Sequence, residues 1–511
     1  MHELRTLLAQ EGDPAQVLGR WTDLAIYPRS VMDAGESLFF LGRRGRVKRL
    51  GVLTLGREPS FDLETRAVTL GGRRLTLGLG ELHAANAAAL RARLPFTAPQ
   101  AVGVRKSVGL GDRLGLATPG HLRALRHTKG LFPILAQQSM REMERTGRNP
   151  QQVLDAATWG VFQEGWQEGW GTDADHLKTE QDLNACAAAG FILYTLDPRD
   201  HVDNQAETDA LPTLAAKFAA LPWGALASTP EVTRAAYLGR AWNLGAGQSL
   251  SLSEEQLLRA AAKYGRAIAH LAALARHLQR LRAGQPWELE ISVDETDTPT
   301  RPEEHFYLAS ELRRLGVQWV SLAPRFVGRF EKGVDYIGDL DRFAADFARH
   351  VAIARALGPY KLSLHSGSDK FSIYPIAARA AGELVHLKTA GTSYLEALRA
   401  VARVQPELFR EILAFALAHY ERDRASYHVS AQMSRVPDPK TLTEQALVEV
   451  LDQFDARQAL HVTFGSVLTA QDAAGHYLFR DRLFAVLEGD EEAHYAALET
   501  HILKHILPFS N

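Results

Sequence analysis

The tetrapeptide His-Leu-Lys-Thr occurs twice in the chain, at residues 176–179 and at residues 386–389. Each copy lies in a segment that otherwise has the apolar character of a buried strand. Because alternate residues of a strand point to the same face, each copy predicts a histidine and a lysine side by side. Neutral imidazole is a ligand for divalent metals, and a nearby ammonium group can stabilise an oxyanion. The two copies therefore indicate two walls of one reactive site.

Three further segments carry polar residues at alternate positions of an otherwise apolar run. These sets are Glu290, Ser292 and Asp294; Lys361, Ser363 and His365; and His428 with Ser430. Strands that are buried on both faces are normally almost continuously apolar, so such polar faces need a partner or a function. Histidine, carboxylate and lysine side chains that converge suit a divalent metal site. The candidate ligands are His176, His365 and His386, and His428, Glu290 or Asp294 could replace one of these histidines.

Two carboxylates stand beside these strands in positions suited to proton transfer. Glu295 lies in "VDETDTPT", directly after an apolar strand and before a Thr-Pro helix start. Asp175 precedes His176, and adjacent strand residues point in opposite directions. A shared site would therefore require a bulge or a strand end at this position. Both carboxylates are candidates for catalytic acid and base roles.

Cationic and small residues near the strand ends are candidates for binding an anionic substrate. Arg325 ends an apolar segment and offers a bidentate fork. The turn "HSGSDK" contains Ser366 and ends with Lys370, and its amides could hold a carboxylate or a phosphate. The lysines of the two repeated tetrapeptides, Lys178 and Lys388, complete this predicted set of substrate contacts.

Eight apolar segments must position these side chains, and amphipathic helical segments separate them. The predicted strands cover residues 131–138, 173–179, 190–198, 288–296, 317–324, 360–369, 383–391 and 426–432. This alternation is typical of an α/β fold, and its strand count favours a (β/α)8 TIM-like barrel over a doubly wound open sheet. Barrel enzymes assemble their sites at the carboxyl ends of the strands, where the polar groups are expected to meet.

The segments outside this pattern predict additions to the barrel. Residues 1–118 contain short runs punctuated by glycine and then a helix, which predicts a β-rich N-terminal extension and a linking helix. The barrel is expected to occupy residues 119–480. The interval at about 199–287 is too long for one crossover and predicts a helical insertion. Residues 481–511 predict a C-terminal helical segment.

Composition limits the classes of function. The chain has 511 residues, is 46% hydrophobic, and has a formal net charge of −2 from 58 basic and 60 acidic residues. This balance gives no global field to attract nucleic acid or an anionic membrane. The single cysteine, Cys186, excludes internal disulfides and cysteine-cluster metal sites. With no signal-like N-terminal run and no apolar span of about 20 residues, we expect a cytoplasmic protein.

Several long stretches together resemble the tagaturonate epimerase family, whose members interconvert the sugar acids tagaturonate and fructuronate. The resemblance extends from about residue 107 to the last helix. The stretches that carry it are "SVGLGDRLGLATPGH", "ATWGVFQEGW", "GTDADHLKT", "ISVDETDTPT", "VSLAPRFVGRFEKGVDYIGDL", "KLSLHSGSDKFSIYP" and "HLKTAGTSYLEALR".

The resemblance implies a metal-dependent epimerase of hexuronate catabolism that binds a small sugar acid and needs no nucleic acid or membrane partner. It implies a divalent cation, with Zn, Mn, Fe, Ni and Co as candidates, on His176, His365 and His386. It also implies proton-handling roles for Asp175 and Glu295. The family does not define the oligomeric state, and a homo-oligomer is compatible with it.

The chemistry of the substrates favours retro-aldol cleavage. Tagaturonate and fructuronate differ at the carbon β to the ketone, whose hydrogen the carbonyl does not acidify. Cleavage, rotation of the aldehyde and re-addition would invert that carbon, with a cation polarising the ketone. A different metal-dependent isomerase, epimerase or aldolase, acting on another ketose or a sugar phosphate, is the first alternative. A non-catalytic sugar-acid-binding protein is the second.

Overall fold

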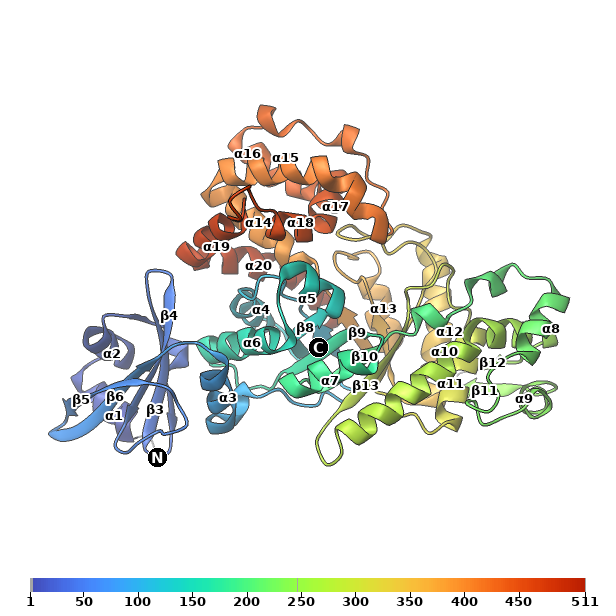
Figure 1. The fold of residues 1–511 in the computed structure, drawn as a ribbon, viewed down its shortest axis with the longest axis horizontal. Coiled ribbons are helices and arrows are strands. Elements are labelled where there is room, and N and C mark those ends of the chain that lie inside the picture. Colours follow the sequence, from blue (N-terminus) through green and yellow to red (C-terminus); the bar gives the residue numbers. More distant parts are fainter. Residues whose placement is uncertain (1–2, 246, 511) are drawn as a thin grey trace.

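The computed structural model describes residues 3–245 and 247–510. Figure 1 shows a central barrel with a β-sheet domain on one side, a helical insertion on the other and a helical layer above. Within the described residues, eight parallel strands close the barrel in the order β10-β13-β14-β15-β16-β7-β8-β9. They are β7 (Ser107–Gly109), β8 (Phe132–Ser139), β9 (Gly171–Leu177), β10 (Leu193–Leu196), β13 (Glu288–Val293), β14 (Ser321–Pro324), β15 (Lys361–Leu364) and β16 (Val385–Lys388).

Helices follow the strands and cover the barrel from outside. They are α4 (Thr118–Leu125), α5 (Met140–Thr146), α6 (Pro150–Glu164), α7 (Glu180–Ala189), α10 (Glu254–Leu281), α11 (Pro302–Arg314), α12 (Leu340–Leu357) and α13 (Tyr374–Ala381). Side-chain caps fix several starts: Asn149 forms a capping box with Gln152 on α6, and Thr179 forms one with Asp182 on α7. The α/β barrel predicted from the sequence is confirmed.

The N-terminal domain contains an antiparallel sheet, and its strand β3 (Ser37–Arg44) packs against apolar residues on both faces. Its strands are β1 (Ala25–Ile26), β2 (Met32–Ala34), β3 (Ser37–Arg44), β4 (Val47–Thr54), β5 (Glu64–Leu70) and β6 (Arg73–Gly80). On β3, Leu38 and Phe40 pack towards α1 (Glu3–Glu11) and α2 (Pro14–Thr22), whereas Phe39 and Leu41 pack towards α3 (Ala84–Arg93) and α6. The alternation of a strand therefore attaches this domain to the barrel.

The insertion and the C-terminal layer occupy the other sides of the barrel (Figure 1). The insertion lies between β10 and β13 and contains α8 (Leu211–Ala219), α9 (Pro230–Tyr237), β11 (Trp242–Gly245), β12 (Gln248–Leu250) and α10. The layer follows β16 and contains α14 (Thr392–Val404), α15 (Pro406–Asp423), α16 (Glu444–Glu449), α17 (Phe454–Val462), α18 (Phe464–Thr469), α19 (Arg480–Gly489) and α20 (Glu491–Ile506). Helix α20 returns to pack against α4 and α14.

Two expectations about the barrel strands are wrong. Residues 426–432 form no strand, because side chains take up their backbone amides: Ser430 donates to Glu331 and Gln432 donates to Asp455. The missing strand is β7, which precedes the predicted barrel boundary at residue 119. With three residues in a Gly-rich stretch, it is too short to show a periodic pattern.

Candidate active site

A bulge at the carboxyl end of β9 brings Asp175 and His176 to the same side. Two residues separate the paired positions Ala174 and Leu177 on β9, against one residue between their partners on β10. His176 has φ of +52°, in the left-handed region that non-glycine residues rarely adopt. Such strained positions persist where the surrounding structure holds them, often at functional sites. From the sequence, Asp175 could share a site with His176 only at a bulge or a strand end, and the structure has such a bulge.

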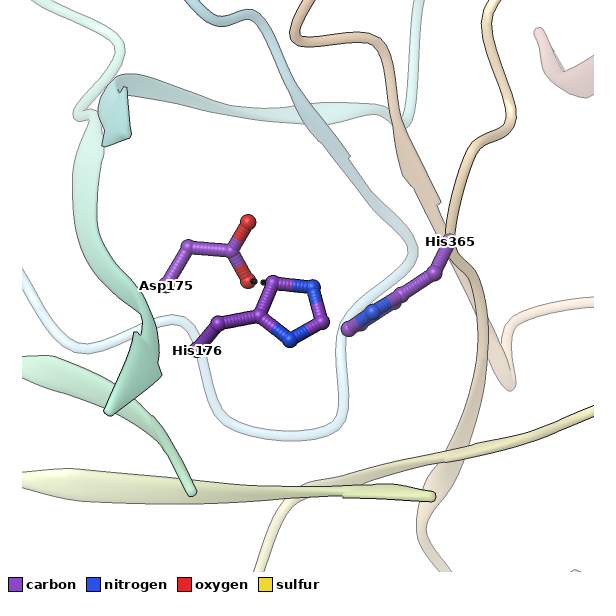
Figure 2. Close-up of side chains that lie close together, drawn as sticks. All are labelled: Asp175, His176 and His365. Carbon is purple, nitrogen blue, oxygen red and sulfur yellow. Dashed lines mark ion pairs between the residues drawn. The ribbon is translucent and has the colours of Figure 1, made fainter. Parts of the chain in front are cut away.

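Asp175, His176 and His365 form a group that could hold a metal ion. Each offers one ligand atom, and these atoms all lie within 4.8 Å of one another. Figure 2 shows Asp175 and His176 projecting from one strand and His365 approaching from the other side. The two imidazole rings meet edge to face, with centroids 5.1 Å apart. An imidazole pair with a carboxylate is a donor set suited to Zn²⁺ and similar cations.

Buried carboxylates orient both histidines. Asp197 Oδ2 lies 3.1 Å from His176 Nδ1, and Glu290 Oε1 lies 2.6 Å from His365 Nε2. The other ring nitrogens also face carboxylates: His176 Nε2 lies 3.8 Å from Asp175 Oδ1, and His365 Nδ1 lies 3.1 Å from Asp294 Oδ1. Metal-bound histidines commonly have one nitrogen held by a carboxylate in this way. The residues present thus fit a divalent cation.

The electrostatic field of this group favours cations. Burial disfavours the charged form of His176, but Asp175 and Asp197 outweigh it and raise the pKa of His176 to about 9. Burial and Lys388 oppose the charge of His365, yet Asp294 and Glu290 still raise its pKa. Negative surroundings that retain protons on two histidines also attract a metal ion, which would displace those protons.

Lys388 joins several carboxylates across the barrel interior. Its Nζ lies 2.7 Å from Asp173, 2.8 Å from Asp175 and 2.7 Å from Glu290, and it donates to Thr195 at 2.9 Å. Burial opposes its charge, but these carboxylates raise its pKa well above the usual value. The pKa of Asp175 lies below its usual range because His176 and Lys388 outweigh the effect of burial. Lys388 therefore favours the ionised forms of Asp175 and Glu290, whereas burial raises the pKa of Asp173 to about 6.

The side chains open into two adjoining pockets. We call the first the inner pocket; among its lining residues are Gln137, Asp175, His176, Lys388 and His461. The second, the outer pocket, is lined among others by Asp294, Glu295, Arg325 and His428. Both are lined by Arg141, Lys332, His365, Ser366 and Tyr427. A ligand in these pockets would lie near both the candidate metal group and several cations.

Comparison with known proteins assigns a family to this barrel. The family model for tagaturonate epimerase matches residues 27–508. The chain is 46% identical over 485 residues to the tagaturonate/fructuronate epimerase of Thermotoga maritima, covering 94% of this chain and 96% of that protein. The chain belongs to the tagaturonate epimerase family. It is accordingly an isomerase, and the family predicted from the sequence motifs is confirmed.

Solved structures agree with this assignment. The glycerol-complexed crystal structure of the fructuronate-tagaturonate epimerase UxaE from Cohnella laeviribosi is 38% identical, with a TM-score of 0.89, over 97% of this chain and 98% of that one. The native crystal structure of the same protein gives 0.88, again at 38% identity, over 97% and 99%. The resemblance thus covers the barrel and its additions alike.

Some predicted site residues of this epimerase lie away from the candidate metal group. His386 is fully buried, and its Nδ1 lies 2.9 Å from Ser107 Oγ. Burial lowers the pKa of His386 to about 3. Lys178 points outward to Asp200, 3.0 Å away, because the bulge breaks the alternation that would have placed it beside His176. The expected common face of His176 and Lys178 is therefore wrong.

Lys370 is engaged with the backbone instead of facing a pocket. Its buried Nζ donates to the carbonyl oxygens of Glu331, Val334 and Ser368. Ser366, by contrast, lines both pockets, with φ of +50°. These observations give Lys370 a role in holding loops together, whereas Ser366 stays within reach of a ligand.

Glu295, Arg325 and His428 all line the outer pocket. Glu295 pairs with Arg141 at 3.0 Å and also with Arg199. Burial lowers the pKa of Arg325, whose backbone amide donates to Thr300. No described group of potential metal ligands contains His428. Glu295 also belongs to a group of possible metal ligands with His176 and Asp197, whose ligand atoms lie within 4.8 Å of one another.

Four residues of this region were missed at the level of sequence: Asp173, Asp197, Lys332 and Arg141. Asp197 ends the predicted strand 190–198, so its position at a strand end was a usable signal. Lys332 lies in "RFEKGVDY", eight positions beyond the end of β14, where no strand pattern indicates a direction. Only the fold brings that loop to the pockets.

Another cluster of potential ligands, Asp369, His501 and His505, is already satisfied internally. The amide of Asp369 donates to His505 Nε2 at 2.9 Å, and His501 Nε2 lies 2.6 Å from Asp369 Oδ1. Arg457 pairs with the same carboxylate at 2.9 Å. This network ties α20 to the loop after β15.

In the described part of the chain, no helix is long and apolar enough to cross a membrane.

Proposed function

We propose that this chain interconverts tagaturonate and fructuronate with a divalent cation held by His176 and His365. Its family relatives are named for that reaction. The observation that carries the proposal is the arrangement of the two histidines. Each is held at one ring nitrogen by a buried carboxylate and lies beside Asp175 in the inner pocket. A bound cation would polarise the ketone and favour the ionised form of the sugar hydroxyls.

We propose retro-aldol cleavage as the route. The hydroxyl group on the carbon β to the ketone loses its proton and becomes the aldehyde oxygen. The bond from that carbon to the carbon next to the ketone breaks, and its electron pair moves to that neighbouring carbon and the former ketone oxygen, which gives an enediolate. The resulting aldehyde turns, and the enediolate attacks its other face. The new alkoxide then takes up a proton, so all atoms are conserved.

Asp175 and Glu295 are the proposed proton-handling residues in this route. Asp175 is kept ionised beside His176 and Lys388 in the inner pocket, as a proton acceptor must be. Glu295 lies in the outer pocket, between Arg141 and Arg199. Since the hydroxyl oxygen changes sides during the reaction, acid and base groups in different pockets suit removal and return of the proton.

The remaining predicted contacts are proposed as supports for the anionic intermediates. Lys388 lines the inner pocket with its ammonium group 2.8 Å from Asp175. Ser366 lies where the pockets meet, and Arg325 lies farther out. Preorganised cations and hydroxyl donors stabilise developing negative charge without reorganising during the reaction.

The test is direct conversion. Protein purified with a divalent metal and incubated with tagaturonate should form fructuronate, a chelator should stop the reaction, and added metal should restore it. No conversion in the presence of excess metal would reject the assignment. In heavy water, retro-aldol chemistry keeps the original hydrogen on the inverted carbon. Substantial deuterium at that carbon would reject the route while leaving the overall reaction in place.

A further inference from the structure

Lys332 is a pocket cation without a carboxylate partner. Its Nζ donates to Ser366 Oγ at 2.7 Å, and it lines both pockets. Within residues 3–245 and 247–510, it makes no ion pair. The neighbouring Arg113 and Arg141 differ, because Glu142 and Glu295 neutralise them at 2.7 Å and 3.0 Å. A half-buried, uncompensated ammonium group at the junction of two pockets is suited to receive an anion.

The loop that carries Lys332 is held from several directions. Buried Lys370 donates to the carbonyl oxygens of Glu331 and Val334, on either side of it. Arg457 Nε donates to the carbonyl of Gly333 at 2.7 Å. The structure thus uses two buried cations to fix the backbone around Lys332. A binding residue held by such contacts loses little freedom when a ligand arrives.

Lys332 is also the pocket cation whose location fits the proposed substrates. In these sugar acids a single carbon separates the inverted carbon from the carboxylate, so the carboxylate must bind close to the reacting atoms. Lys332 lines the inner pocket together with Asp175, His176 and His365. Arg325 lines the outer pocket only.

We propose that Lys332 binds the carboxylate of the substrate and retains the carboxylate-bearing fragment while its aldehyde turns. This inference rests on the proposed function and adds the residue that recognises the acid group. After cleavage, the fragment consists of the aldehyde, one hydroxylated carbon and the carboxylate. A contact at the carboxylate alone leaves the bond between aldehyde and neighbouring carbon free to rotate. The other face of the aldehyde can then meet the enediolate without loss of the fragment.

The test compares Lys332→Met with Lys332→Arg, Arg325→Gln and the control Lys440→Met, which alters an exposed lysine far along the chain. Loss of one charge-assisted hydrogen bond should raise the KM for tagaturonate about 10- to 100-fold in Lys332→Met. Lys332→Arg should recover most of this loss. Lys332→Met should also release more three-carbon aldehyde per turnover, measured by trapping with a hydrazine. Lys440→Met should match the unaltered protein.

Binding of small fragments separates this inference from the proposed reaction. Glycerate carries the carboxylate of the fragment, whereas glycerol lacks it. By calorimetry, the unaltered protein should bind glycerate at least about 10-fold more tightly than Lys332→Met does, with no difference for glycerol. Equal KM values and equal glycerate affinities would overturn the inference while leaving the epimerase assignment intact. It is equally overturned if glycerate does not bind, or if Arg325→Gln causes the losses expected of Lys332→Met.

Discussion

The two copies of His-Leu-Lys-Thr have the same sequence but use their polar residues in opposite ways. In the first copy, His176 faces the inner pocket and Lys178 pairs with Asp200 outside it. In the second, His386 is buried against Ser107 and Lys388 joins the carboxylates of the site. One copy therefore contributes its histidine to the candidate metal group, and the other contributes its lysine.

Backbone geometry explains this difference. The second copy lies on β16, which pairs in regular register with β15 and β7, so His386 and Lys388 share the inward face as predicted. The first copy begins at the bulge of β9, where the positive φ of His176 interrupts alternation. A single inserted residue redirects every side chain that follows it. Identical tetrapeptides thus acquire different functions from the pairing of their strands.

The largest effect that would test this comparison is expected from Lys388→Met. The change would leave Asp173, Asp175 and Glu290 buried without their cation. Removal of one partner of a buried ion pair typically costs about 3–5 kcal/mol, so the free energy of unfolding in urea should fall by about that amount. Epimerase activity should be lost as well. An unchanged unfolding midpoint would show that Lys388 does not hold these carboxylates together.

The two histidines should differ in their effect on metal affinity. Loss of a residue that only hydrogen-bonds to a metal ligand weakens metal affinity by roughly 10- to 100-fold. His176→Ala removes a proposed ligand itself, so it should weaken binding of the divalent cation by more than this. His386→Ala should leave the affinity unchanged, because His386 lies outside the candidate group. Equilibrium dialysis with elemental analysis measures both, and circular dichroism checks that both variants fold. If His176→Ala retains its metal and His386→Ala loses it, the roles of the two copies are reversed.

The smallest effect is expected from Lys178→Met. Its partner Asp200 is two-thirds exposed, and exposed ion pairs contribute about 0–1 kcal/mol. We expect kcat/KM for tagaturonate to stay unchanged and the free energy of unfolding to change by no more than that amount. Steady-state kinetics and urea unfolding, run beside Lys388→Met, measure the contrast between the two lysines. A large rise in KM would show instead that Lys178 contacts the substrate.

The sequence predicted the barrel because most of its strands are long enough to show a pattern. The segments around His176, Glu290, His365 and His386 all form barrel strands or end them. Strand β7 was missed because three residues show no period. Residues 426–432 were mistaken for a strand because an apolar alternation also fits an extended segment whose amides bind side chains.

The candidate site was predictable only in part, for a related reason. His176 and His365 follow recognisable strands, so their convergence could be expected from the barrel, whereas Asp175 joins them only through the bulge of β9. Lys370 carries the same charge as Lys332 and lies in a conspicuous turn, but its ammonium group donates to a backbone carbonyl of the loop that carries Lys332. Lys332 occupies an unremarkable loop and lines both pockets.

The sequence by itself determined the α/β barrel, the family and the residue types available for chemistry, because these depend on local periodicity and on long motifs. The tertiary structure decided which of those residues meet. The bulge at His176 depends on how β9 pairs with its neighbours. Lys388 pairs with Asp175, and Lys370 donates to the carbonyl of Glu331 beside Lys332, so both lysines join segments that are far apart in the chain. Such contacts depend on strand register and loop packing, which no local pattern of residues specifies.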